Sequence, residues 1–249
     1  MRAPMAPAAT LAVTTRVLNQ LRRDHRTMAM LIVVPCVLLT LLWWMFDGDD
    51  QTFNRFGPPL LAMFPFIIMF LVTSVTTLRE RSSGTLERLL TTPMGKADLL
   101  AGYALAFGAV AVLQAVVAVV LTVGLLGMDV RGPIWVLAVV AVLDAILGSA
   151  LGLLVSAFAA TEFQAVQFMP AFVLPQVLLC GLFVPRESLP DVLSVVSDVL
   201  PLSYAVDAMR EVQTESSWTS GLSVDVGVIA GSGLVALALA SATLRRRTA

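Results

Sequence analysis

Charge is scarce in this chain, and this scarcity excludes an ordinary water-soluble protein. Charged residues make up 13% of the 249 positions, hydrophobic residues make up 58%, and the mean hydropathy is +0.88. A soluble globular domain carries about 25% charged residues. The composition therefore predicts a membrane protein. A net charge of −1 without a basic stripe argues against a nucleic-acid partner.

Residues that build metal and nucleophile sites are also few. The only histidine, His25, lies beside three arginines, and the two cysteines, Cys36 and Cys180, fall inside apolar runs without a paired or metal-type spacing. A P-loop needs G-x-x-x-x-G-K-[ST], but the only lysine, Lys96, is followed by Ala97. Serine-hydrolase and zinc-protease motifs are missing as well. We expect no catalytic site, metal site or cofactor in this chain.

Long apolar runs are abundant. A helix needs about 20 apolar residues to cross a bilayer, and the continuous character of these runs differs from the alternating strands of a membrane barrel. The sequence predicts an all-α membrane protein, one domain over residues 1–249, with six transmembrane helices. The six runs are 28–46, 59–78, 99–126, 134–159, 166–184 and 224–244.

Arginine placement predicts the orientation, because Lys and Arg near span ends are retained in the cytoplasm. Six crossings put both termini on one side. Placing that side in the cytoplasm collects the basic residues of the N-terminal segment, the loop after the second run and the C-terminal end there. Only four arginines are left outside, at positions 55, 131, 186 and 210.

The N-terminal segment, residues 1–27, is predicted to form an interfacial helix over 10–26. Leu11, Leu18 and Leu21 share one helical face, and polar residues occupy the others. Such a helix would lie on the cytoplasmic leaflet and lead into the first span. A disordered basic tail is the alternative.

The loop over residues 79–98 carries the sequence RERSSGTLERLLTTP between two apolar runs. Serines are good N-cap residues, and Leu86, Leu89 and Leu90 follow at helical spacing before Pro93 closes the turn. We expect a short amphipathic helix on the cytoplasmic side. It either rests on lipid headgroups or inserts its apolar face into a groove on a partner.

The segment over residues 185–223 is too short to cross the membrane and too apolar to remain in water. Pro185, Pro190 and Pro201 divide it, and a valine- and leucine-rich stretch lies between the last two. The pattern predicts either a re-entrant helical hairpin or an amphipathic helix on the membrane surface.

Asp144 is the only ionisable residue near the centre of a predicted span. A carboxylate there costs roughly 2.5–3.5 kcal/mol unless it faces the bundle interior or is protonated. It is either part of a substrate path together with Gln114 and Gln176, or a buried group with a hydroxyl or amide partner such as one of these two glutamines. Two glycine pairs, Gly148 with Gly152 and Gly227 with Gly231, would allow close helix approach.

Two ordered motifs resemble the ABC-2 family of ABC-exporter permeases, which includes drug-resistance and polyketide exporters. RERSSGTLERLLTTP is similar to the family segment after the second span, and ESLPDVLSVVSDVLPLSYAVDAMRE is similar to the segment before the last span. The resemblance covers nearly the whole chain. Together with the excess of Arg over Lys, it suggests the cytoplasmic membrane of a bacterium.

The resemblance implies a permease that exports an amphipathic, drug-like or lipid-like substrate. It implies a separately encoded ABC ATPase, in two copies, that holds ATP and Mg, and a second permease copy or a paralogue. The coupling residues would be Arg79, Glu80, Arg81, Gly84, Thr85, Leu86, Glu87, Leu89, Leu90, Thr92 and Pro93. The re-entrant motif would comprise Pro190, Pro201, Leu202, Tyr204, Asp207 and Arg210.

Two other classes remain as alternatives. An ion-driven secondary multidrug transporter would show internal repeats and paired charges within the spans. A non-transport integral membrane assembly protein would show a docking domain or an interfacial polar cluster. Neither set of features is evident in the sequence.

Overall fold

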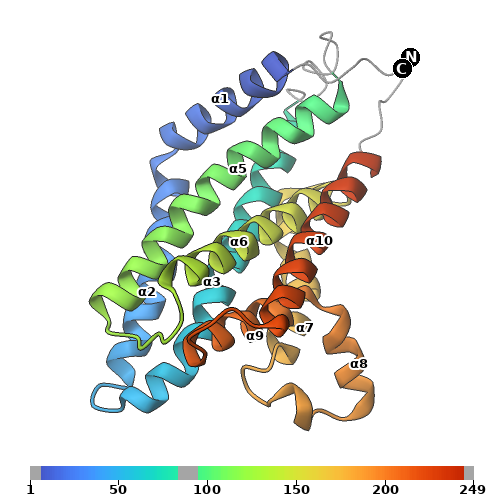
Figure 1. Cartoon of the computed structure of the whole chain (residues 1–249). Coiled ribbons are helices and arrows are strands. Elements are labelled where there is room, and N and C mark those ends of the chain that lie inside the picture. The colour runs from blue at the N-terminus through green and yellow to red at the C-terminus, as the bar shows by residue number, and fades with distance from the viewer. Residues whose placement is uncertain (1–6, 84–94, 244–249) are drawn as a thin grey trace.

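The computed structural model describes residues 7–83 and 95–243, and every regular element in them is helical. Figure 1 shows a bundle of long helices with shorter helices at its ends. The elements are α1 (Pro7–Arg23), α2 (His25–Met45), α3 (Asp50–Ser82), α5 (Lys96–Val119) with a π-helical continuation η1 (Val120–Leu125), α6 (Ile134–Ser156), α7 (Glu162–Leu179), η2 (Arg186–Ser188), α8 (Asp191–Val199), α9 (Pro201–Thr214) and α10 (Ser220–Thr243).

Five helices are long and apolar enough to cross a membrane, namely α2, α3, α5 with η1, α6 and α10. The count rises to six if α8 and α9, which are bent by 87° at their junction, form one broken span. The prediction of an all-α membrane protein is confirmed. The predicted run 166–184 corresponds to α7, which has 18 residues and begins earlier, at Glu162. Glu162, Gln164 and Gln167 make its first two turns polar, so it is not among the five.

The bundle has two ends, which we name after the helices that lie there. The α1 end carries α1, the C-terminal ends of α3, α6 and α10, and the start of α5 (Figure 1). The α9 end carries α8, α9 and the connections before α3 and α6. Helix α7 runs between them, because Glu162 bonds to Arg79 at the end of α3 and the Leu179 carbonyl accepts a hydrogen bond from Ser197 of α8.

Helices α3 and α6 form the tightest seam of the core. A Cβ atom on Gly148 would lie 2.4 Å from the Phe66 carbonyl oxygen, and one on Gly152 would lie 2.5 Å from that of Phe70. Both phenylalanines are fully buried. The other predicted pair behaves differently, since a Cβ at Gly227 or Gly231 would meet no atom within 4 Å. Only the first pair mediates close helix approach in this chain.

Helix α1 is present, and its buried face is rotated relative to the predicted apolar face, with Leu21 common to both. Val13, Val17 and Leu21 are buried, whereas Leu11 is 60% exposed. The reason lies on α5, where Gly102 has no side chain and leaves room for Val13. A Cβ on Gly102 would be 2.6 Å from the Val13 Cβ. The space beside Gly102 on α5 therefore determines that the Val13 side of α1 is buried.

Helix α2 starts independently of α1, because Asp24 caps it. The Asp24 carboxylate accepts hydrogen bonds from the Thr27 hydroxyl at 2.6 Å and from the Thr27 backbone N–H at 3.1 Å. These bonds stabilise the charged form and lower the pKa of Asp24. Asp49 caps α3 in the same way through Thr52.

Candidate functional site

The predicted coupling loop is described only at its two flanks. Gly84, Thr85, Leu86, Glu87, Leu89, Leu90, Thr92 and Pro93 lie outside the described residues. The flanks are the last turns of α3, with Arg79, Glu80 and Arg81, and the start of α5 after Gly95. Both flanks lie at the α1 end, where contacts with neighbouring helices hold them in place.

Glu80 is held by α1. The Arg16 guanidinium donates to the Glu80 carboxylate at 2.8 Å and to the Tyr103 hydroxyl of α5 at 3.1 Å. The Glu80 side chain is 8% exposed, so its charge is largely removed from water. One residue of α1 thus joins the end of α3 to α5, and truncating it would leave a buried carboxylate without its cation.

The second flank also meets α1. Asp98 accepts a hydrogen bond from the Gly95 backbone N–H at 3.0 Å, which caps the start of α5. The Thr10 hydroxyl approaches the other Asp98 carboxylate oxygen at 3.4 Å, and the Thr14 hydroxyl donates to the Gly102 carbonyl at 3.2 Å. Helix α1 therefore contacts the chain on both sides of the coupling loop.

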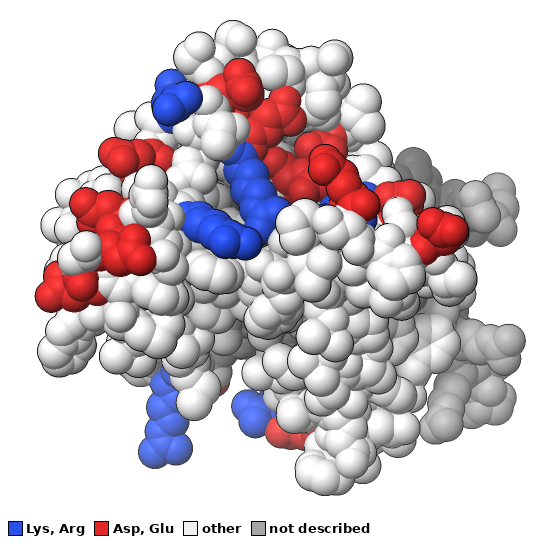
Figure 2. All heavy atoms as spheres, turned by 90° about the horizontal axis from the view of Figure 1, so that it is seen from below, with Lys and Arg blue, Asp and Glu red and all other residues white. Residues whose placement is uncertain are grey.

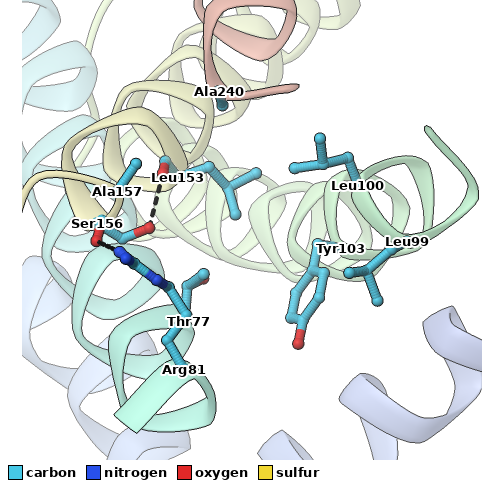
Figure 3. Close-up of a pocket in the computed structure, with 9 residues that line it drawn as sticks. All are labelled: Thr77, Arg81, Leu99, Leu100, Tyr103, Leu153, Ser156, Ala157 and Ala240. Atoms are coloured by element: carbon cyan, nitrogen blue, oxygen red, sulfur yellow. Dashed lines mark hydrogen bonds between the residues drawn. The ribbon is translucent and has the colours of Figure 1, made fainter. Parts of the chain in front are cut away.

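The two arginines that bracket Glu80 bond to the next pair of helices. Arg79 makes a two-pronged ion pair with Glu162 of α7, with both contacts at 2.9 Å, and this pair is exposed. Arg81 donates to the Ser156 carbonyl at the end of α6 (Figure 3). The three residues of the Arg-Glu-Arg motif thus contact α7, α1 and α6.

A small cavity lies beside Arg81 between α3, α5, α6 and α10. Figure 3 shows Thr77 and Leu153 on one side and Leu100, Tyr103 and Ala240 around the rest. Its volume of about 10 Å³ suits a single water molecule. The buried Thr77 hydroxyl, which has no protein partner within the described residues, lines this cavity and would bond to a water placed there.

At the α9 end, Arg186 organises the predicted re-entrant motif. Its guanidinium bonds to Asp198 of α8 at 2.6 Å and to Asp207 of α9, and it lies 4.9 Å from the centre of the Tyr204 ring. Burial lowers the pKa of Arg186, but the bonds with Asp207 and Asp198 outweigh that effect and hold the pKa above its ordinary value. Arg210 donates to the carbonyl of Gly181, which has φ +88°.

Gln176 does not meet Asp144 and instead supports the α8–α9 corner. Its side-chain carbonyl accepts a hydrogen bond from the Leu202 backbone N–H at 3.4 Å, next to Pro201 at the start of α9. The fully buried Ser197 bonds to the Leu179 carbonyl and lies 3.1 Å from the Ser203 hydroxyl. Pro190 is the N-cap residue of α8. The predicted motif residues 190, 201, 202, 204, 207 and 210 are therefore brought together with Gln176.

Asp144 is fully buried in α6, and neither carboxylate oxygen has a hydrogen-bond partner within the described residues. The amide of Gln114 on α5 is also buried and without a partner there. The expected amide-to-carboxyl bond is thus not formed by Gln114 or by Gln176. A buried carboxyl without a partner is costly, so the choice between a substrate path and a purely structural role for Asp144 stays a prediction.

Sequence reasoning missed the residues that hold the coupling loop. Arg16 appeared as one of several arginines in a basic segment, and neither Tyr103 nor Asp98 stood out. Arg16 and Glu80 are 64 positions apart, so no local spacing connects them. Asp98 carried one local signal, because an acidic residue three positions after Gly95 suits a helix N-terminus.

The long apolar helices of this bundle define an integral membrane protein. The family model for the ABC-2 type transporter matches residues 8–214, and the chain belongs to this family.

The chain is similar to several named permeases. It is 25% identical over 191 residues to "Probable multidrug ABC transporter permease YbhS" of Escherichia coli (strain K12), which covers 76% of this chain and 51% of that protein. It is 28% identical over 155 residues to "Probable multidrug ABC transporter permease YbhR" of the same organism, which covers 62% and 42%. "Linearmycin resistance permease protein LnrN" of Bacillus subtilis (strain 168) is 24% identical over 186 residues, covering 72% and 48%. The chain spans about half the length of these curated relatives.

Proposed function

We propose that this chain is the membrane-spanning permease subunit of an ATP-driven exporter. Membership of the ABC-2 type transporter family carries the proposal, and the similarity to proteins named as multidrug and resistance permeases supports a drug-like or lipid-like amphipathic substrate. The chain would work with two copies of a separate ABC ATPase that hold ATP and Mg, and with a second permease copy or paralogue. Its place would be the cytoplasmic membrane of a bacterium, with both termini in the cytoplasm.

The coupling loop would transmit the movement of the ATPase. The arrangement of its flanks supports this role, because Glu80 and Asp98 are both in contact with α1 while Arg79 and Arg81 bond to α7 and α6. A displacement of the loop would therefore reach α1, α6 and α7 at once. The ATPase can shift the permease between conformations only if it binds the loop differently in each, so the Leu86, Leu89 and Leu90 face must change its contacts during the cycle.

Asp144 and Gln114 would belong to the substrate path. Their support is the combination of full burial and missing partners, since ionisable residues inside membrane bundles often mark substrate pathways. The α8–α9 corner would form a re-entrant hairpin near the exit. The 87° bend and the contact of its buried Ser197 with the end of α7 support that placement.

The test is a double substitution in the loop, Leu86→Asp with Leu89→Asp, in the permease co-expressed with its ATPase. Charges on the apolar face should abolish co-purification of the ATPase and substrate-stimulated ATP hydrolysis in lipid nanodiscs. The matched control is Leu86→Met with Leu89→Met, which keeps the face apolar and should retain both activities. If the aspartate variant kept its ATPase partner and its stimulation, this loop would not be the coupling surface.

A further inference from the structure

A cleft at the α9 end is walled by two tryptophans that are distant in the sequence. The rings of Trp135 at the start of α6 and Trp218 before α10 are stacked, with centroids 6.4 Å apart and an angle of 19° between their planes. The cleft has a volume of about 50 Å³ and is bordered by Glu215, Ser217, Val212 and Leu222 as well. A cavity that holds one water molecule has a volume of about 10–15 Å³, so this cleft has room for a small polar group.

The walls of this cleft are held in place by backbone contacts. The Gly132 N–H donates to the Val212 carbonyl at 2.9 Å, and a Cβ on Gly132 would lie 2.8 Å from the Glu215 carbonyl oxygen. This close approach brings Trp135, three residues further on, against the end of α9. The Trp218 indole N–H donates to the Ser223 hydroxyl at 2.6 Å, which fixes the second ring.

Three features of the cleft favour a cation. Glu215 follows the last residue of α9, so its carboxylate adds to the negative end of the helix dipole. The faces of tryptophan rings attract cations more strongly than those of other aromatic residues. The Glu215 carboxylate is also not neutralised by an arginine. Arg131 lies in the loop before α6, and neither it nor Glu215 forms an ion pair within the described residues.

The surroundings of the cleft are acidic. Figure 2, which views the α9 end, shows carboxylates spread across the face with few arginines among them. The arginines at this end are residues 55, 131, 186 and 210. The carboxylates are residues 47, 49, 50, 129, 187, 191, 198, 207, 211, 215 and 225. A surface of one sign raises the local concentration of ions of the opposite sign.

We propose that the cleft of Trp135, Trp218 and Glu215 binds a primary ammonium group. Its three N–H donors would bond to the Glu215 carboxylate and the Ser217 hydroxyl, which border the cleft, whereas a quaternary ammonium has no such donors. The ammonium belongs either to the headgroup of phosphatidylethanolamine or to a free amine. This binding site is independent of the proposed coupling to an ATPase.

Tryptophan fluorescence of the full chain reports on this cleft directly. Trp43→Phe with Trp44→Phe leaves Trp135 and Trp218 as the only emitters, since the chain has four tryptophans. In nanodiscs of phosphatidylcholine, we expect a saturable change in emission as phosphatidylethanolamine is added, and none with phosphatidylglycerol. Glu215→Gln in this background should weaken the response at least tenfold. Glu187→Gln, which removes another exposed carboxylate at the same end, should leave it unchanged.

A second arm separates the two sources of the amine. Ethylamine is titrated into discs of pure phosphatidylcholine: a response there identifies a free amine, and a response to phosphatidylethanolamine alone identifies the lipid headgroup. Trp135→Leu provides a second variant in which Trp218 reports alone and the response should be lost. If neither amine changes the emission, or if Glu187→Gln acts like Glu215→Gln, the cleft binds no ammonium and its tryptophans serve only as membrane anchors.

Discussion

At the α1 end, ion pairs join segments that are far apart in the sequence, whereas at the α9 end they join neighbours. Arg16 and Glu80 are separated by 64 positions, and Arg79 and Glu162 by 83. Arg186 reaches Asp198 and Asp207 over only 12 and 21 positions. The first set connects α1, α3 and α7 around the coupling loop, while the second closes the corner between α8 and α9 on itself.

The two ends therefore differ in which helices their ion pairs connect. A disturbance of the α1 end is passed to several long helices, because each ion pair there belongs to two of them. At the α8–α9 corner the ion pairs stay within residues 186–207, and hydrogen bonds connect the corner to α7. The α3–α6 seam connects the two ends, since its glycines bring the two backbones together in the middle of the bundle.

The largest expected effect comes from substitutions that push α3 and α6 apart at their closest contact. Gly148→Ala with Gly152→Ala places two methyl groups against the Phe66 and Phe70 carbonyls. Overpacking costs typically about 1–3 kcal/mol per site, so the pair should lower the free energy of unfolding by several kcal/mol and disturb both ends. Thermal unfolding in nanodiscs measures it. Gly227→Ala with Gly231→Ala is the matched control, and an equal loss there would contradict this account of the seam.

Removing the cation of the α1 end is the next largest change. Arg16→Ala leaves the Glu80 carboxylate buried and unpaired, which should cost about 3 kcal/mol and reduce ATPase stimulation. Arg23→Ala, an exposed residue of the same helix, should do neither. The charge swap Arg16→Glu with Glu80→Arg should recover part of both losses. A swap that is no better than Arg16→Ala alone would show that the pair does not join α1 to α3.

Arg186→Gln tests whether the α8–α9 corner is self-contained. Loss of the charged bonds to Asp198 and Asp207 should destabilise the corner by about 1–2 kcal/mol. Hydrogen exchange should rise over residues 186–210 and stay unchanged in α1 and at the end of α3. Arg55→Gln, an exposed arginine at the same end without an ion pair among the described residues, is the control. Faster exchange at the α1 end would refute the division into distant and local pairs.

The smallest expected effect concerns the junction of α1 and α2. Asp24→Ala removes the cap of α2 and should cost about 1 kcal/mol. Because the pKa of Asp24 is lowered in the folded state, its contribution is present above the unfolded pKa of about 3.9 and is lost as the pH falls through the folded pKa. Asp24→Asn keeps an acceptor and should remove this part of the acid dependence. The free energy of unfolding, measured between acidic and neutral pH for the unchanged chain and for Asp24→Asn, tests this expectation.

Much of the fold follows from local patterns, and less of the site does. The apolar runs predict the spanning helices, and the Arg-Glu-Arg motif marks the end of α3. The predicted apolar face of α1 includes the buried Leu21, but the burial of Val13 depends on Gly102, which lies on another helix. Gln176 was one candidate partner for Asp144, yet its side-chain carbonyl bonds to the start of α9. Roles that depend on a partner far along the chain have no local signal.

The sequence by itself determined that this chain is a bundle of membrane helices, because the length and apolarity of a span are set by the thickness of the bilayer and need no neighbour. It also determined the cap at Asp24, which bonds only three residues ahead. The tertiary structure alone decided that Arg16 meets Glu80, that Gly148 rather than Gly227 brings helices together, and that Trp135 stacks on Trp218. These pairings depend on which helices lie side by side and on how closely their backbones approach, and both depend on the packing of the whole bundle.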